Sequence, residues 1–366
     1  MTEDFLVDWL VVSAVSGLGP LRIRQLLEHM DVQQLRQRLE HEPQSIAARL
    51  QASHIVAAKQ KVELALSWQD AAANHVIITQ NSPFYPPLLK QIDDAPTVLF
   101  CKGDIDILVA PSVAIVGSRD ASRNGLQQAY DFAAQMAGLG IVVISGMAAG
   151  IDGAAHQGSL AAGGRTLGVL GTGVEQVYPK RHRNLFRDVI DSGCLVSEFW
   201  PDVKPFSGNF PKRNRIISGL ALGTLVIEAR RKSGSLITAR LASEQGREVF
   251  ALPGSLLAGD HQGCHDLIKN GAKLVENIAD IVEELPPLLR AHLESLAIEP
   301  HLAKEDSSEL PFKSLLASVG YETTAIDVVV ANSGIALDLV LEQLLELELQ
   351  GLVAAVPGGY VRLKRS

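Results

Sequence analysis

Six short apolar runs between residues 112 and 254 constrain the fold of this chain more than any other feature. They are SVAIVG, GIVVISG, TLGVLG, GCLVSE, GTLVIEA and REVFALPG, and helical patterns separate most of them. Strands without a polar face are buried on both sides, which requires helices on both faces of a parallel sheet. The sequence therefore predicts an α/β fold built on a doubly wound parallel sheet.

The segments on either side of these runs have different patterns. Up to residue 75, Leu, Ile and Val recur at helical spacing, which predicts a small helical domain of the SAM or helix-hairpin-helix kind. Its turn Gly17-Leu18-Gly19-Pro20 can offer backbone N–H groups to a phosphate, although such turns more often connect two helices without binding a ligand. Residues 311–366 read as helix, turn, helix and a hairpin, the outline of a winged helix. We expect domains at 1–75, 76–285 and 311–366, with a linker at 286–310.

Composition excludes several classes of protein. The chain has 366 residues, of which 47% are hydrophobic, enough for two or three soluble domains. The apolar stretch from Phe5 is interrupted by Asp8 and lacks a basic flank, so we expect no signal peptide, no membrane span and a cytoplasmic location. The three Cys residues are far apart, which argues against disulfides, a zinc site or a redox pair, and the segment HQGCH lacks further ligands, so we expect no metal.

Small residues follow most of the predicted strands. In an open parallel sheet, ligands bind beyond the carboxyl ends of the strands, where helix N-termini present N–H groups to anions. The residues at this edge include Gly117-Ser118-Arg119, Ser145-Gly146, Gly171-Thr172-Gly173 and Ser233-Gly234-Ser235. Turns of α/β proteins are rich in Gly and Ser whatever they bind. Several such turns together with Arg119 favour a phosphate ligand.

The same turns argue against a dinucleotide and against catalysis. The turn VGSRDASRNG is not G-x-G-x-x-G, no Walker A motif follows any strand, and Ser145-Gly146 supplies no acid for a ribose, so we expect no cofactor. Ser145, Asp152 and His156 superficially suggest a hydrolase. However, Asp152 and His156 lie four residues apart on one helix, a spacing that does not form an ordered triad with Ser145, and we expect no catalytic residue and no enzyme.

Cations gather at this edge although the formal net charge is -8. Twelve of the 33 Lys and Arg residues fall in three clusters and one turn, namely Lys180, Arg181, Arg183 and Arg187; Lys212, Arg213 and Arg215; Arg230, Arg231 and Lys232; and Arg119 with Arg123. A single phosphate needs two or three cations, whereas a strip of this length suits a polymer with one charge per nucleotide. We expect Lys212, Arg213 and Arg215 to hold phosphates and Asn214 to bond to backbone or base.

Aromatic residues beside the cations favour single-stranded over double-stranded nucleic acid as the ligand. An exposed ring stacks on an unpaired base, which contributes about 1 to 3 kcal/mol per base. Phe210 stands outside any apolar periodicity and is the best candidate, whereas we expect Phe186 and Tyr178 to be buried.

At this point the residues resemble a known family, the DNA-processing protein DprA, also called Smf. The resemblance covers residues 83 to 277 almost continuously. The segments that carry it are YPPLLKQIDDAPTVLFCKGD, VAIVGSRDASRNG, ISGMAAGIDGAAHQGSL, VLGTGVEQVYPKRHRNL, FPKRNRIISGLA, LVIEARRKSGSLITARLASEQGREVFALPG and GCHDLIKNGAKLV. The resemblance implies an extended Rossmann-like core that binds single-stranded DNA, protects incoming strands and loads RecA recombinase in natural transformation. It also implies a homodimer, single-strand binding protein as a further partner, and no enzyme activity.

The resemblance and the sheet-edge argument select overlapping residues. The resemblance implies a DNA pocket of Gly117, Ser118, Arg119, Lys180 and the segment 210–215. Together the two arguments give an expected DNA-binding set of Gly117, Ser118, Arg119, Ser145, Gly146, Gly171, Lys180, Arg181, Phe210, Lys212, Arg213, Asn214 and Arg215. Two residues depart from the family pattern: Glu175 stands where Asp is common, and His265 stands where Asn is usual.

The winged-helix segment has the wrong charge for duplex DNA. Residues 321–352 contain six acids and no Lys or Arg, so phosphate would be repelled, and we expect a protein-contact or regulatory module there.

For the chain as a whole, the competing hypothesis is an enzyme or carrier that uses the same edge of the sheet for a nucleotide or a phosphorylated small ligand.

Overall fold

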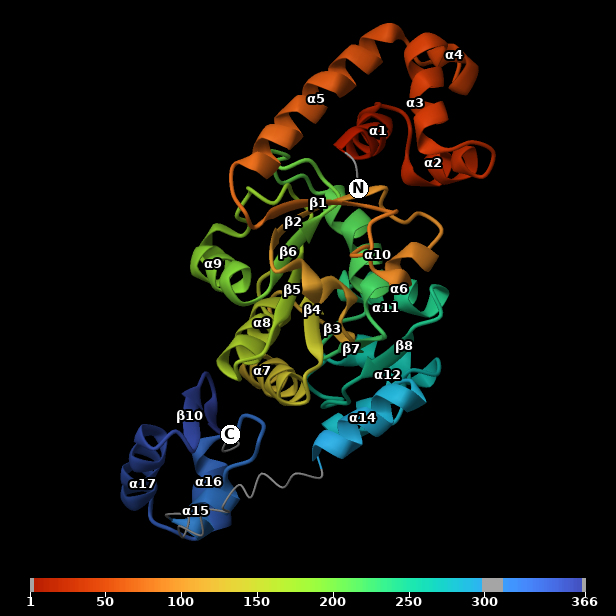
Figure 1. Ribbon diagram of the computed structural model, residues 1–366. Coiled ribbons are helices and arrows are strands. Elements are labelled where there is room, and N and C mark those ends of the chain that lie inside the picture. Colours follow the sequence, from red (N-terminus) through yellow and green to blue (C-terminus); the bar gives the residue numbers. More distant parts are fainter. Residues whose placement is uncertain (1–2, 298–311, 364–366) are drawn as a thin grey trace. The chain divides into compact units, whose positions relative to one another are not determined.

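A computed structural model describes residues 3–297 and 312–363. The chain divides into two compact units, Met1–Glu294 and Ser295–Ser366. The first unit holds the N-terminal helices and the large sheet, and the second holds the winged helix (Figure 1).

The chain before the sheet is helical, as its periodicity predicts. Its helices are α1 (Glu3–Ala14), α2 (Pro20–Leu27), α3 (Val32–His41), α4 (Pro43–Ile46) and α5 (Ala52–Asp70). Pro20 opens α2, where its missing N–H costs nothing, and a capping box between Asp31 and Gln34 starts α3. Leu10, Ile23 and Leu35 pack in the shared core of these helices.

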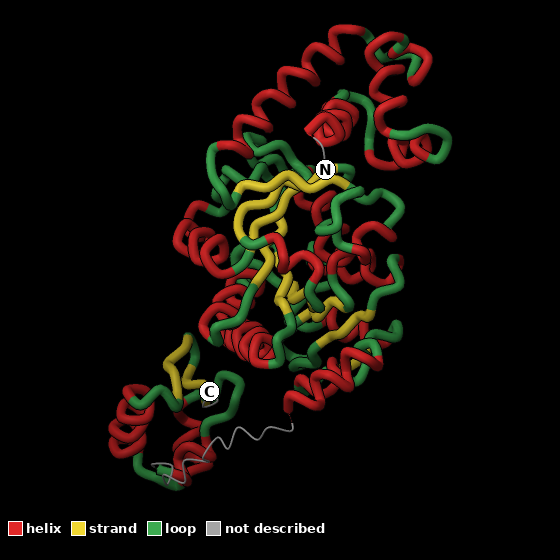
Figure 2. The backbone as a smooth tube through the Cα atoms, in the orientation of Figure 1, coloured by secondary structure: helices red, strands yellow, loops and turns green. Residues whose placement is uncertain are grey.

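A nine-stranded sheet forms the centre of the first unit, in the order β1-β2-β6-β5-β4-β3-β7-β8-β9. All six apolar runs are parallel strands within it: β3 (Ser112–Val116), β4 (Val142–Ser145), β5 (Thr166–Val169), β6 (Cys194–Ser197), β7 (Gly223–Val226) and β8 (Glu248–Ala251). Figure 2 shows these strands running through the middle of the unit. The predicted α/β fold with a doubly wound sheet is confirmed.

The two ends of the sheet differ from a purely parallel arrangement. β1 (His75–Thr79) and β2 (Val98–Gly103) are antiparallel to each other, and β2 is antiparallel to β6. The opposite edge carries β9 (Lys273–Leu274), which is parallel to β8 and too short to show a sequence pattern. The predicted boundary at residue 75 coincides with the first residue of β1.

Helices cover both faces of the sheet (Figure 1). One face packs against α7 (Arg123–Gly138), α8 (Ile151–Ala161) and α13 (Ile278–Val282) through Ile115, Val143 and Phe250. The other face packs against α6 (Pro87–Gln91), α10 (Asn209–Leu220), α11 (Ser235–Glu244) and α12 (Gln262–Lys269). The short helix η1 (Ile105–Val109) packs in the core of this second face, whereas α9 (Arg183–Ser192), which follows the short helix η2 (Lys180–His182), packs against α8, β2 and β6.

The strand order reverses direction next to β3. From β3 the chain builds β4, β5 and β6 on one side and then crosses to build β7, β8 and β9 on the other. The loops that leave β3 and β7 therefore diverge, and they open a crevice at the carboxyl end of the sheet.

The end of the first unit corrects one expectation. Part of the predicted linker is helix α14 (Pro287–Ala297), and Leu293 is buried in the core on the α7 face. The rest of that predicted linker, residues 298–310, lies outside the described residues.

The second unit has the predicted winged-helix elements. They are α15 (Lys313–Ser318), α16 (Ile326–Ser333), α17 (Leu337–Leu349) and the hairpin of β10 (Val353–Val356) and β11 (Gly359–Arg362). Within residues 3–297 and 312–363, no single helix is long and apolar enough to span a membrane. Only α16 and α17 taken together reach that threshold, and they are bent by 107° at their junction.

Candidate nucleic-acid interface

A cavity of about 640 Å³ opens at the carboxyl ends of the strands, and we call it the strand-end cavity. Its lining comes from the loops after β3, β4, β5 and β7 and from α10 and α11, and includes Gly117, Ser118, Arg119, Asp120, Ala148, Asp152, Tyr178, Phe210, Pro211, Arg213, Asn214, Arg230, Lys232, Ser233, Gly234 and Ser235. It lies at the point where the strand order reverses, the position at which sheets of this type bind ligands.

The loop after β3 is held in place by a buried acid. Glu228, which follows β7, is 1% exposed, and its carboxylate accepts bonds from the Ser122 N–H and, at 2.7 Å, from the Ser122 hydroxyl. The Ser118 N–H donates to the Glu228 carbonyl at 2.8 Å. Gly117 leaves room for α8, because a Cβ there would lie 2.5 Å from Ile151. The backbone between Gly117 and Ser122 is therefore fixed before any ligand arrives.

Two rings and a guanidinium form one wall of the strand-end cavity. The Tyr178 and Phe210 ring centroids lie 5.4 Å apart at 36°, and the Arg119 guanidinium lies 5.8 Å from the Phe210 centroid. Tyr178 is 45% exposed, so its predicted burial is wrong, whereas the predicted burial of Phe186 is confirmed at 3% exposure. The sequence offered one signal for Tyr178, which is its position two residues before Lys180 in a loop that leaves the sheet edge.

Gly171 lies against Phe210 and outside the lining of the strand-end cavity. It is buried, and a Cβ there would lie 2.7 Å from a ring carbon of Phe210. The glycine therefore allows the ring to settle against the sheet edge.

The segment FPKRNR lies inside α10 and not ahead of it, which separates its three cations. Successive helical residues are about 100° apart, so Lys212, Arg213 and Arg215 point in different directions. Of the three cations that were expected to hold phosphates, only Lys212 is exposed, whereas Arg213 and Arg215 are buried.

Arg213 is buried under the floor of the strand-end cavity. Its side chain is only 3% exposed, Nη1 donates to the Val169 carbonyl at 2.7 Å, and the guanidinium fills the space where Gly146 lacks a Cβ. Burial lowers the pKa of Arg213 to about 10, and Asp152 partly offsets this. Burial also raises the pKa of Asp152, which accepts bonds from the N–H groups of Gly146 and Ala148. These two charged residues support the loop from below.

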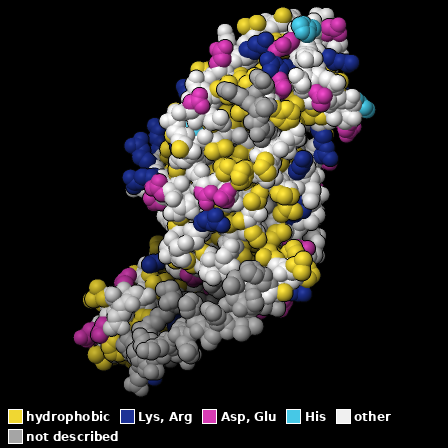
Figure 3. Space-filling view, in the orientation of Figure 1, with side chains coloured by type: hydrophobic (Ala, Val, Ile, Leu, Met, Phe, Trp, Pro, Cys, Tyr) yellow, Lys and Arg dark blue, Asp and Glu magenta, His cyan; other side chains and the backbone are white. Residues whose placement is uncertain are grey.

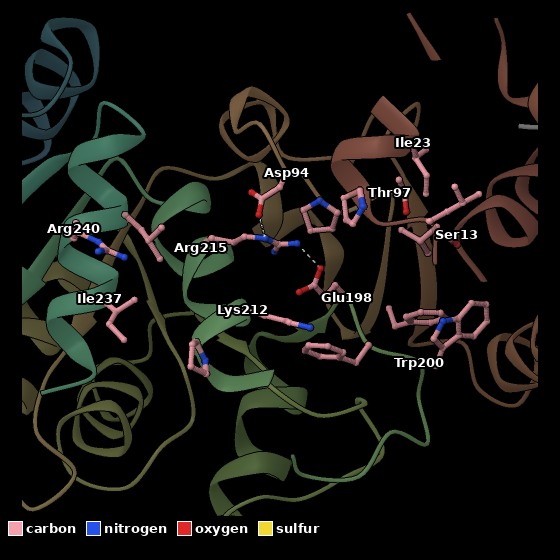
Figure 4. Close-up of a pocket in the computed structure, with 18 residues that line it drawn as sticks. Ser13, Ile23, Asp94, Thr97, Glu198, Trp200, Lys212, Arg215, Ile237 and Arg240 are labelled. Atoms are coloured by element: carbon pink, nitrogen blue, oxygen red, sulfur yellow. Dashed lines mark hydrogen bonds and ion pairs between the residues drawn. The ribbon is translucent and has the colours of Figure 1, made fainter. Parts of the chain in front are cut away.

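Arg215 and Lys212 belong to a second cavity, of about 780 Å³, between the N-terminal helices and the sheet. We call it the interdomain cleft; Ser13, Leu18, Pro20 and Ile23 line one side, and Phe100, Glu198, Phe199, Trp200, Lys212, Arg215 and Arg240 line the other. Figure 4 shows Lys212 extending into this cleft, while Arg215 bonds to both Asp94 and Glu198. With 8% exposure and two carboxylate partners, Arg215 has a structural role, contrary to its expected contact with phosphate.

The remaining expected residues divide between the core and the surface. Ser145 is buried, donates to the Ile115 carbonyl at 2.6 Å and lies with Gly146 beneath the cavity. Asn214 lines the cavity, and Lys180 and Arg181 are exposed on η2. Figure 3 shows Lys and Arg gathered at the edge where α9 lies in Figure 1.

The third basic cluster is largely neutralised. Arg230 pairs with Asp260 at 2.6 Å, and Arg231 pairs with Asp266 at 3.0 Å. Lys232 is the member of this cluster that lines the strand-end cavity without a carboxylate within 4.0 Å among the described residues. These partners lie some 30 residues away along the chain, so charge counting could not find them.

Both departures from the family pattern have defined contacts. Glu175 accepts bonds from Trp68 Nε1 and Lys102 Nζ, each at 2.8 Å, and thereby ties the end of α5 to the edge of the sheet. Burial opposes its charge, but these bonds outweigh it and lower the pKa of Glu175. The ring of His265 lies 3.0 Å from the Gly254 carbonyl oxygen, so an imidazole occupies the place of the usual amide.

Family models and curated relatives match most of the chain. A model described as DNA recombination-mediator protein A matches residues 76–286, and one described as the DprA winged helix domain matches residues 299–359. Protein Smf of Escherichia coli K12 is 45% identical over 311 residues, which is 84% of this chain and 82% of that protein. DNA processing protein DprA of Streptococcus pneumoniae is 46% identical over 200 residues, which is 55% of this chain and 71% of that protein.

Two solved structures of DprA proteins have folds similar to that of this chain. The X-ray structure of DprA from Streptococcus pneumoniae has a TM-score of 0.67 at 36% identity, covering 76% of this chain and 98% of that chain. A structure describing the single-stranded DNA binding mode of DNA processing protein A from Helicobacter pylori has a TM-score of 0.52 at 28% identity, covering 60% of this chain and 96% of that chain. With its ordered motifs, its sheet and its winged helix all matched, the chain belongs to the DprA/Smf family of DNA recombination-mediator proteins.

Proposed function

We propose that this protein binds single-stranded DNA in the strand-end cavity. The observation that carries the proposal is the wall formed by Tyr178, Phe210 and Arg119, which sets two rings beside a cation at the mouth of a backbone-lined cavity. Phosphate would lie against Gly117 and Ser118, and an unpaired base would stack on Phe210. A relative from Helicobacter pylori is described as binding single-stranded DNA, which supports the same ligand here.

A duplex fits this wall poorly. Its bases are already stacked and paired, so no base face is free to meet the Phe210 ring, and only phosphate contacts would remain. Exposed cations continue beyond the cavity at Lys180, Arg181 and Arg183, and no carboxylate lies within 4.0 Å of any of them in the described parts of the chain. A continuing row of free cations favours a polymer over a mononucleotide.

The arrangement of polar side chains supports binding without catalysis. The Ser145 hydroxyl donates to Ile115, Asp152 accepts from the loop backbone, and His156 Nδ1 lies 2.7 Å from the Thr166 hydroxyl. Each of the three residues that superficially suggest a hydrolase is therefore bonded to a different partner. An enzyme or carrier of a nucleotide or phosphorylated ligand remains the competing proposal, since about 640 Å³ also accommodates a small ligand.

The wider role follows from the family. We propose that the protein acts in the cytoplasm during natural transformation, protects incoming strands, self-associates as a homodimer and loads RecA recombinase, in exchange or cooperation with single-strand binding protein. A shortened lag in RecA filament assembly on DNA coated with single-strand binding protein would support the loading step, and an unchanged lag would contradict it.

The binding proposal is tested by fluorescence anisotropy with labelled oligo-dT and a duplex of equal length at several salt concentrations. The variant Arg119→Ala/Lys180→Ala should weaken single-strand binding at least about tenfold and reduce the salt slope by about 1.4, because each lost phosphate contact on a single strand contributes about 0.7. The matched control is Arg38→Ala/Arg49→Ala, which removes two exposed Arg residues, one in α3 and one in the turn between α4 and α5.

Three results would contradict the proposal. They are equal affinity for duplex and single strand, an unaffected Arg119→Ala/Lys180→Ala variant that remains folded, or a control variant that loses as much affinity as the test variant. Saturation by a mononucleotide at the concentration that saturates with oligo-dT would favour the competing proposal.

A further inference from the structure

A third cavity, of about 510 Å³, lies on the other side of Arg119, and we call it the flanking cavity. Its lining includes Arg119, Asp120, Arg123, Gly153 and Arg181. Arg119 and Asp120 also line the strand-end cavity, so the two cavities meet at these two residues. A flexible ligand that fills one can continue into the other past Arg119.

The flanking cavity contains three cations from three separate segments. Arg119 follows β3, Arg123 is the first residue of α7, and Arg181 lies in η2. All three side chains are exposed, and within residues 3–297 and 312–363 none has a carboxylate within 4.0 Å. They differ in this from Arg230 and Arg231, which are paired with acids. The cavity thus has three unneutralised positive charges against the single carboxylate of Asp120.

Backbone forms much of the remaining wall. Gly150 precedes α8 with a φ of 76°, and a Cβ there would lie 2.2 Å from the Ser118 carbonyl oxygen, so only glycine allows the two loops to approach this closely. Gly153 and Ala154 in the first turn of α8 line the cavity, and no side chain caps that helix. The positive end of the α8 dipole therefore adds to the three cations.

We propose that the flanking cavity is a second single-strand subsite, which takes the phosphates of nucleotides adjoining those in the strand-end cavity. Arg123 and Arg181 contact these phosphates, and Arg119 is shared at the junction. The inference rests on the proposed function and extends it, because it makes affinity depend on strand length. A strand that fills only the strand-end cavity does not reach Arg123, whereas a longer strand does.

The test compares oligo-dT of about 4 and about 16 nucleotides, the two ends of the range of single-strand site sizes. Arg123→Ala/Arg181→Ala should bind the short oligonucleotide as the wild type does. It should bind the long one about tenfold more weakly, with the salt slope reduced by about 1.4 for that oligonucleotide alone. Arg123→Lys/Arg181→Lys, which keeps both charges, should restore most of the affinity, and Arg38→Ala/Arg49→Ala again serves as the charge-matched control.

The failure of this inference differs from the failure of the proposed function. If the wild type does not bind single strands at all, the proposed function fails. If Arg119→Ala weakens both lengths while Arg123→Ala/Arg181→Ala weakens neither, the strand-end cavity stands and the flanking subsite is overturned. An equal loss at both lengths would also overturn it, because Arg123 and Arg181 would then belong to the same subsite as Arg119.

Discussion

Removal of the Phe210 ring should weaken single-strand binding without changing its salt dependence. The ring centroid lies 5.4 Å from that of Tyr178 and 5.8 Å from the Arg119 guanidinium, and the ring is the surface on which we place a base. One base stacked on an aromatic ring contributes about 1 to 3 kcal/mol. Since 1.4 kcal/mol corresponds to a factor of ten, the Kd for oligo-dT should rise about 5- to 140-fold.

The choice of variants separates stacking from packing. Phe210→Leu keeps an apolar side chain against Gly171 but has no ring face, so it should lose most of the stacking contribution while its Tm stays close to that of the wild type. Phe210→Tyr keeps the ring and should bind nearly as the wild type does. Neither variant alters a charge, so the slope of log Kd against log salt should remain unchanged, whereas Arg119→Ala should reduce it by about 0.7.

Anisotropy titrations at three salt concentrations, with thermal unfolding of each variant, decide the matter. Wild-type affinity in Phe210→Leu would show that no base stacks on this ring. A reduced salt slope in the same variant would show that the ring acts by positioning Arg119, and the stacking argument would be wrong.

The other predictions concern the residues that support the site. Gly171→Ala places a methyl group 2.7 Å from the Phe210 ring, so it should weaken oligo-dT binding in titrations without changing the salt slope. Glu175→Ala removes the acceptor shared by Trp68 and Lys102; urea unfolding should show a loss of about 1 to 3 kcal/mol, and hydrogen exchange should accelerate at the end of α5, while unchanged exchange would contradict the docking role. Burial lowers the pKa of His156 to about 3, with smaller contributions from His182 and Arg213, so below an ordinary pKa of about 6.5 the unfolded chain binds a proton that the folded chain does not. The free energy of unfolding should therefore fall as the pH drops below about 6.5, by up to about 1.4 kcal/mol per unit, and His156→Asn should flatten this fall in urea titrations at stepwise pH.

Strands without a polar face made the sheet predictable. In SVAIV the four residues after Ser112 are apolar, so both faces of the strand are, and a strand of that kind is stable only between two layers of helices. Local composition was therefore sufficient to identify the fold class. The antiparallel β1 and β2 and the two-residue β9 have no such signature, because their places depend on neighbours that are distant in sequence.

The candidate site was predictable in position but not in detail. Strand ends place Gly117, Ser118 and Arg119 at the cavity, and these residues do line it. The direction in which each cation of α10 points depends on its position in the helix. Successive positions differ by about 100°, so an error of one residue in placing a cation changes its predicted direction by that angle. The partner of Arg215 is Asp94, 121 residues earlier, and no local pattern identifies such a pair.

The loop between β5 and η2 connects the N-terminal helices with the strand-end cavity. Glu175 in this loop accepts a bond from Trp68 at the end of α5, and Tyr178, three residues later, forms part of the wall of the strand-end cavity. A change in how the N-terminal helices dock would therefore move a residue of the DNA site through a connection only three residues long. By thermodynamic reciprocity, any partner that binds the docked and undocked helices with different affinity must alter the affinity for DNA by the same factor, and DNA must alter the affinity for that partner.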